Sequence, residues 1–237
     1  MKKALAQFVA AAALTAAAFS AQAVTLNLTN YANGSVAASG GAPTFNTNAG
    51  AFTGTLSGAP GFDASPFTTY CVQLSQTFGW GNLLNYTVQG GSSYFNSQVP
   101  ALPSSGATVV DRLGKLFTWL GGVSVPATAT ESAAIQLAVW ESIYEGANTL
   151  SLGGGAFSAT STSAVLTAAN AMLAAAASVT TNLYNVSVLQ SLTQQDFLLV
   201  SHNGGGSNGG NVPEPASLGL VALALAGLAL SRRRRGA

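Results

Sequence analysis

The hydrophobic pattern of this chain changes its period twice, and this change constrains the fold more than any single motif. Alternating or β-branched stretches separated by Gly, Pro and Asn turn signals predict strands at residues 24–28, 35–38, 51–56, 67–78 and 85–89. Helical spacing then predicts helices at residues 108–120, 128–144 and 161–178, before strands return at 184–189 and 197–201. We therefore expect an α+β fold: an antiparallel β-rich domain, sandwich or barrel, with a helical insertion of about three helices.

Charge is scarce and unevenly placed. Only 6% of the 237 residues are charged, against roughly a quarter in an ordinary soluble domain. Six of the eight basic residues lie at the two chain ends, so the interior holds two basic and six acidic residues, a net charge of −4. Such an interior has no basic surface for phosphates, which argues against a nucleic-acid partner. The low charge and the many small polar residues indicate an extracellular, β-rich protein.

The N-terminus has the three regions of a secretory signal peptide. Lys2 and Lys3 precede an apolar run from Ala4 to Phe19, and Ala21-Gln22-Ala23 fits an Ala-x-Ala cleavage site. We expect residues 1–23 to be removed; the alternative is a short N-terminal membrane anchor. Residues 24–201 then form one domain, long enough to bury a substantial core.

A second three-part signal lies at the C-terminus. A Gly/Asn-rich linker at residues 202–212 leads to Pro213, Glu214 and Pro215. An apolar run at 216–230 follows, and four arginines, Arg232, Arg233, Arg234 and Arg235, come after it. A helix over the apolar run is about 22 Å long, a marginal membrane span. The arginines are expected to keep that end on the cytoplasmic side.

This order of elements in residues 213–237 resembles the PEP-CTERM sorting signal of Gram-negative bacteria. The resemblance implies a single C-terminal hydrophobic helix that anchors the chain transiently in the inner membrane. It implies recognition by an exosortase near Pro213-Glu214-Pro215, and then release to, or attachment at, the cell surface, often in bacteria that make exopolysaccharide. The alternative is a plain C-terminal anchor.

Familiar catalytic and metal sites do not fit this composition. The single cysteine, Cys71, forms neither an intramolecular disulfide nor a Cys-based zinc site. The single histidine, His202, lies at the edge of the Gly/Asn linker, where it cannot be held beside a nucleophile. Apart from two on one predicted helix, Glu141 and Glu145, the acidic residues show no ligand-like spacing. We therefore expect no enzyme, no metal and no cofactor; a secreted hydrolase is the least favoured alternative.

One chemistry uses a cysteine without histidine: a glutamine side chain acylates the thiol, ammonia leaves, and an internal thioester remains. Cys71 lies in the strand-like Tyr70-Cys71-Val72, and Gln136 lies in the predicted helix within Ile135-Gln136-Leu137-Ala138-Val139-Trp140. An amide flanked by apolar residues must be hydrogen-bonded or consumed. The alternatives are a small buried Cys71 and a Gln136 that is capped or solvated.

The paired motifs, about 65 residues apart, resemble those of the Cys-Gln thioester domains of Gram-positive surface adhesins. The resemblance covers roughly residues 67–144 and implies that Cys71 is the thiol and Gln136 the acyl donor. This chain departs from that family by its Gram-negative sorting signal.

We expect an exported cell-surface or extracellular-matrix protein that is sorted by an exosortase. Its thioester would attach it covalently to an amine or hydroxyl partner at the cell surface or in the exopolysaccharide matrix. The alternative is a non-reactive structural or exopolysaccharide-associated surface protein with a buried free cysteine. Among the neighbouring residues, we expect Trp140 and Tyr70 to be core or site walls and Glu141 and Glu145 to lie on a solvated helix face. Trp80, between two glycines, is either a core residue anchoring a loop or a sugar-stacking aromatic.

Overall fold

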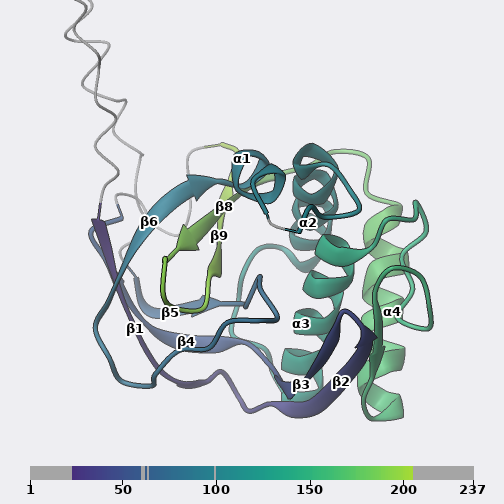
Figure 1. Ribbon diagram of the computed structural model, residues 1–237, viewed down its shortest axis with the longest axis horizontal. Coiled ribbons are helices and arrows are strands. Elements are labelled where there is room, and N and C mark those ends of the chain that lie inside the picture. The colour runs from purple at the N-terminus through teal and green to yellow at the C-terminus, as the bar shows by residue number, and fades with distance from the viewer. Residues whose placement is uncertain (1–22, 60–61, 63, 99, 205–237) are drawn as a thin grey trace, which may run out of the picture.

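The computed structural model describes residues 23–59, 62, 64–98 and 100–204. Its main sheet is antiparallel and has six strands in the spatial order β5-β4-β1-β6-β8-β9. Their bounds are β1 Ala23–Tyr31, β4 Phe52–Ser57, β5 Ala64–Thr69, β6 Leu84–Gly90, β8 Tyr184–Gln190 and β9 Phe197–His202. The sheet curls into an open barrel, which fills the left part of Figure 1.

Irregular pairing helps the sheet to curl. The register of β1 against β4 shifts between Leu28 and Asn30, and that of β4 against β5 shifts between Gly54 and Leu56. Bulges of this kind bend a strand and increase its twist. Gly54 is needed at the second shift, because a Cβ there would lie 1.9 Å from the backbone oxygen of Asn27.

The two edge strands of the sheet meet through residues that follow β5. Cys71 forms an isolated antiparallel bridge with Phe197, the first residue of β9. On either side of the bridge, Val72 N donates to Asp196 O at 3.1 Å and Leu198 N donates to Tyr70 O at 2.9 Å. Cys71 therefore lies where the curled sheet closes on itself.

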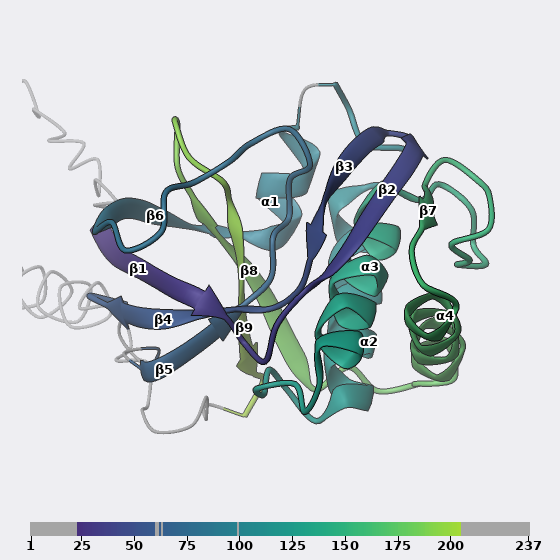
Figure 2. The same ribbon diagram turned by 90° about the horizontal axis from the view of Figure 1, so that it is seen from below.

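A second sheet and four helices cover one side of the barrel (Figures 1 and 2). The second sheet has the order β3-β2-β7, with β2 at Val36–Ala42, β3 at Thr44–Ala49 and β7 at Ser158–Thr160. The helices are α1 Gly91–Asn96, α2 Gly106–Leu120, α3 Ala129–Tyr144 and α4 Ser163–Ala177. Helix α3 packs against α2, α4 and the β2–β3 hairpin.

The central helix, α3, is buried on all sides. Every residue from Ser132 to Ile143 is buried, which is typical of a helix that runs through a core. Thr128 caps its first turn by accepting a hydrogen bond from Glu131 N, and Glu131 Oε2 accepts one from Ala127 N. Thr128 and Glu131 therefore form a variant of the capping box, in which the carboxylate reaches the residue before the cap.

The predicted fold class is confirmed for the described residues: the domain is antiparallel, rich in β structure and barrel-like, with its helices on one side. The predicted strand at 67–78 is wrong beyond Thr69, since only the bridge at Cys71 continues it. Strands β3 and β7 and helix α1 were not predicted. The expected C-terminal helix lies outside the described residues.

Candidate functional site

Strand pairing sets the direction of the backbone groups of Cys71. The hydrogen bonds to β9 come from its neighbours, Tyr70 and Val72, so Cys71 and Phe197 form a non-hydrogen-bonded pair. In such a pair the N–H and C=O groups point away from the partner strand. Both polar groups of Cys71 thus face away from β9 and need partners elsewhere, because the residue is buried.

Gln136 supplies both partners. Its Oε1 accepts a hydrogen bond from Cys71 N at 2.9 Å, and its Nε2 donates one to Cys71 O at 3.0 Å. The glutamine is only 1% exposed. Its amide therefore pairs with Cys71 as a neighbouring strand would. The structure brings the two residues of the predicted crosslink together from different elements, α3 and the segment after β5.

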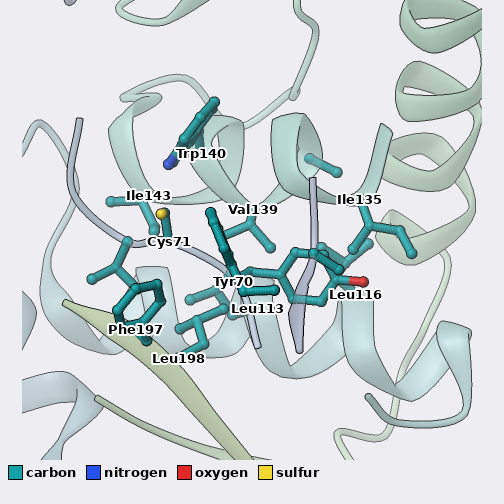
Figure 3. Packing of buried hydrophobic residues seen from close by; sticks show 14 of the residues in the cluster. Tyr70, Cys71, Leu113, Leu116, Ile135, Val139, Trp140, Ile143, Phe197 and Leu198 are labelled. Atoms are coloured by element: carbon teal, nitrogen blue, oxygen red, sulfur yellow. The ribbon is translucent and has the colours of Figure 1, made fainter. Parts of the chain in front are cut away.

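The thiol is held in a water-poor environment. Cys71 is 6% exposed, and burial raises the pKa of its thiol far above the ordinary range, so the thiol is protonated at neutral pH. Figure 3 shows its sulfur beside Ile143, with Trp140 on one side and Phe197 on the other, whereas the ring of Tyr70 points away toward Leu116. This environment limits hydrolysis of any acyl group carried on the sulfur.

No imidazole is close to the thiol. His202 is the last residue of β9, whereas Cys71 bridges to the first, Phe197. The two ends of that strand are about 16 Å apart at 3.3 Å per residue. His202 instead packs edge-on against Tyr184, with ring centroids 5.2 Å apart. The histidine belongs to the sheet and not to a linker, which corrects the expectation for its surroundings.

The hydrogen bonds also polarise the glutamine carbonyl. A nucleophile that adds to Gln136 Cδ places negative charge on Oε1, and Oε1 already accepts a bond from Cys71 N–H. A fixed backbone donor at a developing oxyanion lowers the barrier to acyl transfer. The pair therefore offers an acyl group at Gln136 Cδ, a thiol on the same residue as the oxyanion donor, and a nitrogen, Nε2, that can leave as ammonia.

Both residues line an open cavity of about 280 Å³ on the molecular surface. One part of its wall is aromatic, with Trp80 44% exposed beside Tyr31, Phe52 and Phe78. Trp80 is the one aromatic of this wall that the sequence marks as a candidate for sugar stacking. The polar part of the wall was not predicted, and it comes from Asn46, Asn48, Gln73, Gln76 and Gln195. The alternating asparagines of 46–48 were the available signal, in a strand that was not predicted.

A second polar cluster was interpreted incorrectly. Glu141 and Glu145 are buried, at 0% and 2% exposed, and do not lie on a solvated helix face. Burial raises the pKa of Glu141 to about 7, although its Oε1 accepts a hydrogen bond from Ser151 N at 2.6 Å. Burial also acts on Glu145, but four backbone N–H groups outweigh it and lower the pKa. The helical pattern alone could not show that α4 and the loop after α3 cover this face.

The described residues include no group of three or more His, Cys, Asp and Glu side chains arranged to hold a metal ion. No helix among them is long and apolar enough to cross a membrane. The predicted sorting residues, Pro213 to Pro215 and Arg232 to Arg235, lie outside the described part of the chain.

Residues 211–235 match the family described as the PEP-CTERM protein-sorting motif. The chain carries an exosortase sorting signal. This motif marks the protein as an exosortase substrate that is exported to the cell surface or the extracellular space. Comparison with curated proteins found no match, and comparison with solved structures found none either.

Proposed function

We propose that this exported protein forms an internal thioester between Cys71 and Gln136 and uses it to attach covalently to an amine or hydroxyl partner. The observation that carries the proposal is the pair of hydrogen bonds between the Gln136 amide and the backbone of Cys71. They hold a buried amide against the residue that bears the only thiol of the chain.

The bond-forming step balances without an added reagent. The Cys71 sulfur adds to Gln136 Cδ, the Cδ–Nε2 bond breaks, and the thiol proton leaves with the nitrogen as ammonia. Cys71 N–H stabilises the charge on Oε1 during the addition. The product links residues 65 positions apart. By analogy with a disulfide, such a loop closure contributes about 4 kcal/mol to stability.

The product is an electrophile that is used once. An amine or hydroxyl that attacks Gln136 Cδ displaces the sulfur and becomes bonded to the protein, while Cys71 regains a thiol. No step regenerates the thioester, so the chain acts as a capture device and not as an enzyme with turnover. Both residues line the open cavity, which is the side from which a partner would approach this carbon.

One observation favours a second function, that of a non-reactive structural surface protein. The Gln136 amide already has a partner at each end, as a purely structural side chain would. In that case the glutamine replaces a missing strand, and Cys71 is a small core residue.

Intact mass separates the two functions. A thioester makes the mature protein lighter by one ammonia, and Cys71→Ala or Gln136→Ala abolishes the deficit. Gln98→Ala is a matched control, since Gln98 also hydrogen-bonds to a backbone carbonyl, Tyr94 O, at 3.0 Å. A wild-type protein with the full unmodified mass, whose thiol reacts stoichiometrically once unfolded, would exclude the thioester.

For sorting, we propose that residues 216–230 anchor the chain in the inner membrane until the exosortase acts near Pro213-Glu214-Pro215. Deleting Arg232 to Arg235, or replacing the Pro-Glu-Pro motif with alanines, should leave a membrane-bound precursor on an immunoblot. Unchanged processing of both variants would contradict this anchoring step.

A further inference from the structure

The cavity over Cys71 and Gln136 has an unusual electrostatic character. None of the described residues that line it carries a charge. A lysine ammonium that entered would lose its hydration without gaining a carboxylate, which is costly. A hydroxyl gives up only hydrogen bonds, and the amides of the wall can replace these. The lining therefore favours a neutral, hydroxyl-bearing ligand.

Four aromatic rings form a continuous platform on one side of the cavity. Trp80 contacts Phe78 at 4.8 Å, Tyr31 at 5.1 Å and Phe52 at 5.6 Å between ring centroids. These contacts fix the orientation of Trp80 while almost half of its surface stays exposed. A rigid, exposed indole face beside polar groups suits the C–H face of a sugar ring.

Two residues that line the cavity each carry a buried polar atom without a hydrogen-bond partner among the described residues. One is Trp140 Nε1, a donor on a side chain that is only 2% exposed, and the other is Gln76 Oε1, an acceptor. Figure 3 shows the indole nitrogen of Trp140 on the side that faces Cys71. A buried, unpaired N–H costs free energy unless a ligand satisfies it. One donor and one acceptor are the complement of hydroxyl groups.

We propose that this cavity binds a neutral glycan and presents one of its hydroxyls to Gln136 Cδ. The proposal rests on the proposed function, since the glycan becomes covalently attached only if the thioester exists. Trp80 stacks on one sugar ring, and Trp140 N–H and Gln76 Oε1 bind hydroxyls deeper in the cavity. Trp140 lies one helical turn beyond Gln136 on the same face of α3, and both residues line the cavity.

The transfer step balances. The glycan oxygen bonds to Gln136 Cδ, the Cδ–Sγ bond breaks, and the hydroxyl proton passes to the Cys71 sulfur. The product is an ester with a free thiol. Because burial keeps the pKa of Cys71 high, the departing sulfur retains this proton.

Reversible binding is tested first, in the full-length chain carrying Cys71→Ser, which cannot form the thioester. The probes are cellohexaose, maltohexaose, isomaltohexaose and mannohexaose. Binding of each sugar is measured by the change in tryptophan fluorescence. Hexagalacturonate and a lysine-containing hexapeptide serve as charged probes. We expect saturable binding of at least one neutral hexasaccharide and none of the charged probes. Failure of all four neutral sugars, or equal binding of a charged probe, would overturn the proposal.

Variants then locate the site. Trp80→Ala should weaken binding about tenfold, whereas Trp119→Ala, which removes an equally exposed indole (47%) from α2, should leave it unchanged. Trp140→Phe keeps the ring and removes the N–H, and should weaken binding about fivefold. Equal losses for Trp80→Ala and Trp119→Ala would place binding elsewhere.

Mass spectrometry of the wild-type protein with the sugar that binds separates this inference from the proposed function. Covalent gain of one hexasaccharide supports both. If the wild type binds the glycan but shows no ammonia deficit, the glycan site is supported and the thioester is excluded. If it shows the ammonia deficit but binds no glycan, the thioester is supported and the glycan site is excluded.

Discussion

The side-chain amide of Gln136 pairs with both backbone polar groups of Cys71, at 2.9 and 3.0 Å, in the position that a neighbouring strand would occupy. Strand β4 pairs with β5 as far as Thr69 and does not reach Cys71. One glutamine from a buried helix therefore completes the hydrogen bonding at the point where the barrel closes. Site and fold depend on the same contact.

Replacing this glutamine should destabilise the domain strongly. Gln136→Ala leaves two buried backbone groups unpaired, and we expect a loss of about 2–5 kcal/mol in the free energy of unfolding, measured with urea. The expectation holds before and after thioester formation, because either the hydrogen bonds or the crosslink is lost. Gln194→Ala, at a part-exposed position before β9, is the control. A loss for Gln136→Ala no larger than that of the control would contradict this role.

The buried carboxyl of Glu141 should make stability depend on pH. Its pKa is raised by burial from 4.5 to about 7, so the folded state binds the proton more tightly than the unfolded state does. The contribution of Glu141 to the free energy of unfolding is therefore greatest below pH 4.5, and it is lost as the pH rises to about 7. Glu141→Gln should remove the fall and stabilise the protein at pH 8 by at most about 3 kcal/mol.

Urea unfolding of this variant between pH 5 and 8 is the measurement, with Asp111→Asn, an exposed carboxyl on α2, as control. Glu141 Oε2 has no hydrogen-bond partner among the described residues. The amide nitrogen that replaces Oε2 in Glu141→Gln therefore breaks no hydrogen bond. If Glu141→Gln and wild type show parallel pH profiles, the carboxyl does not titrate in this window.

Two cations on the same helix should differ sharply in their contribution to stability. Arg112 Nη1 donates a hydrogen bond to Glu145 O at 2.6 Å, and its Nη2 donates one to Ala147 O at 2.7 Å. These two bonds hold the segment that follows α3 against α2. Lys115 pairs with Asp111 at 2.8 Å near the surface. We expect Arg112→Ala to cost about 2–3 kcal/mol and Lys115→Ala less than about 0.5 kcal/mol. Thermal unfolding of the two variants is the comparison, and equal shifts would show that the bonds to these carbonyls add nothing.

The sequence allowed the class of the fold and the pair at its centre to be predicted. Turn signals and helical spacing are local, so they located α2, α3 and α4 to within two residues. The Cys71–Gln136 pair could be predicted because each residue departs from its surroundings: one is the only thiol, and the other is an amide in an apolar helix.

What failed depended on contacts between distant segments. The pair Gly40-Gly41 is typical of a turn, but both residues lie within β2, where the ring of Phe45 occupies the space of a side chain at Gly40. The burial of Glu141 depends on the covering loop that contains Ser151. The cavity combines residues from β1, β3, β4 and α3 with residues from the two segments that precede β6 and β9, and no local pattern predicts that combination.

Closure of the barrel should depend on the absence of a side chain at Gly54. A Cβ there meets the backbone oxygen of Asn27 at 1.9 Å, and backbone on a paired strand cannot move aside without breaking the β1–β4 register. Gly90 has φ −62° and ψ 130° and open space around its Cα, so alanine fits there. We expect Gly54→Ala to destabilise the domain by more than about 3 kcal/mol and Gly90→Ala to be neutral or stabilising by up to about 1 kcal/mol. Urea unfolding of both variants tests this, and a Gly54→Ala protein as stable as wild type would show that β1 and β4 do not need their close approach at this position.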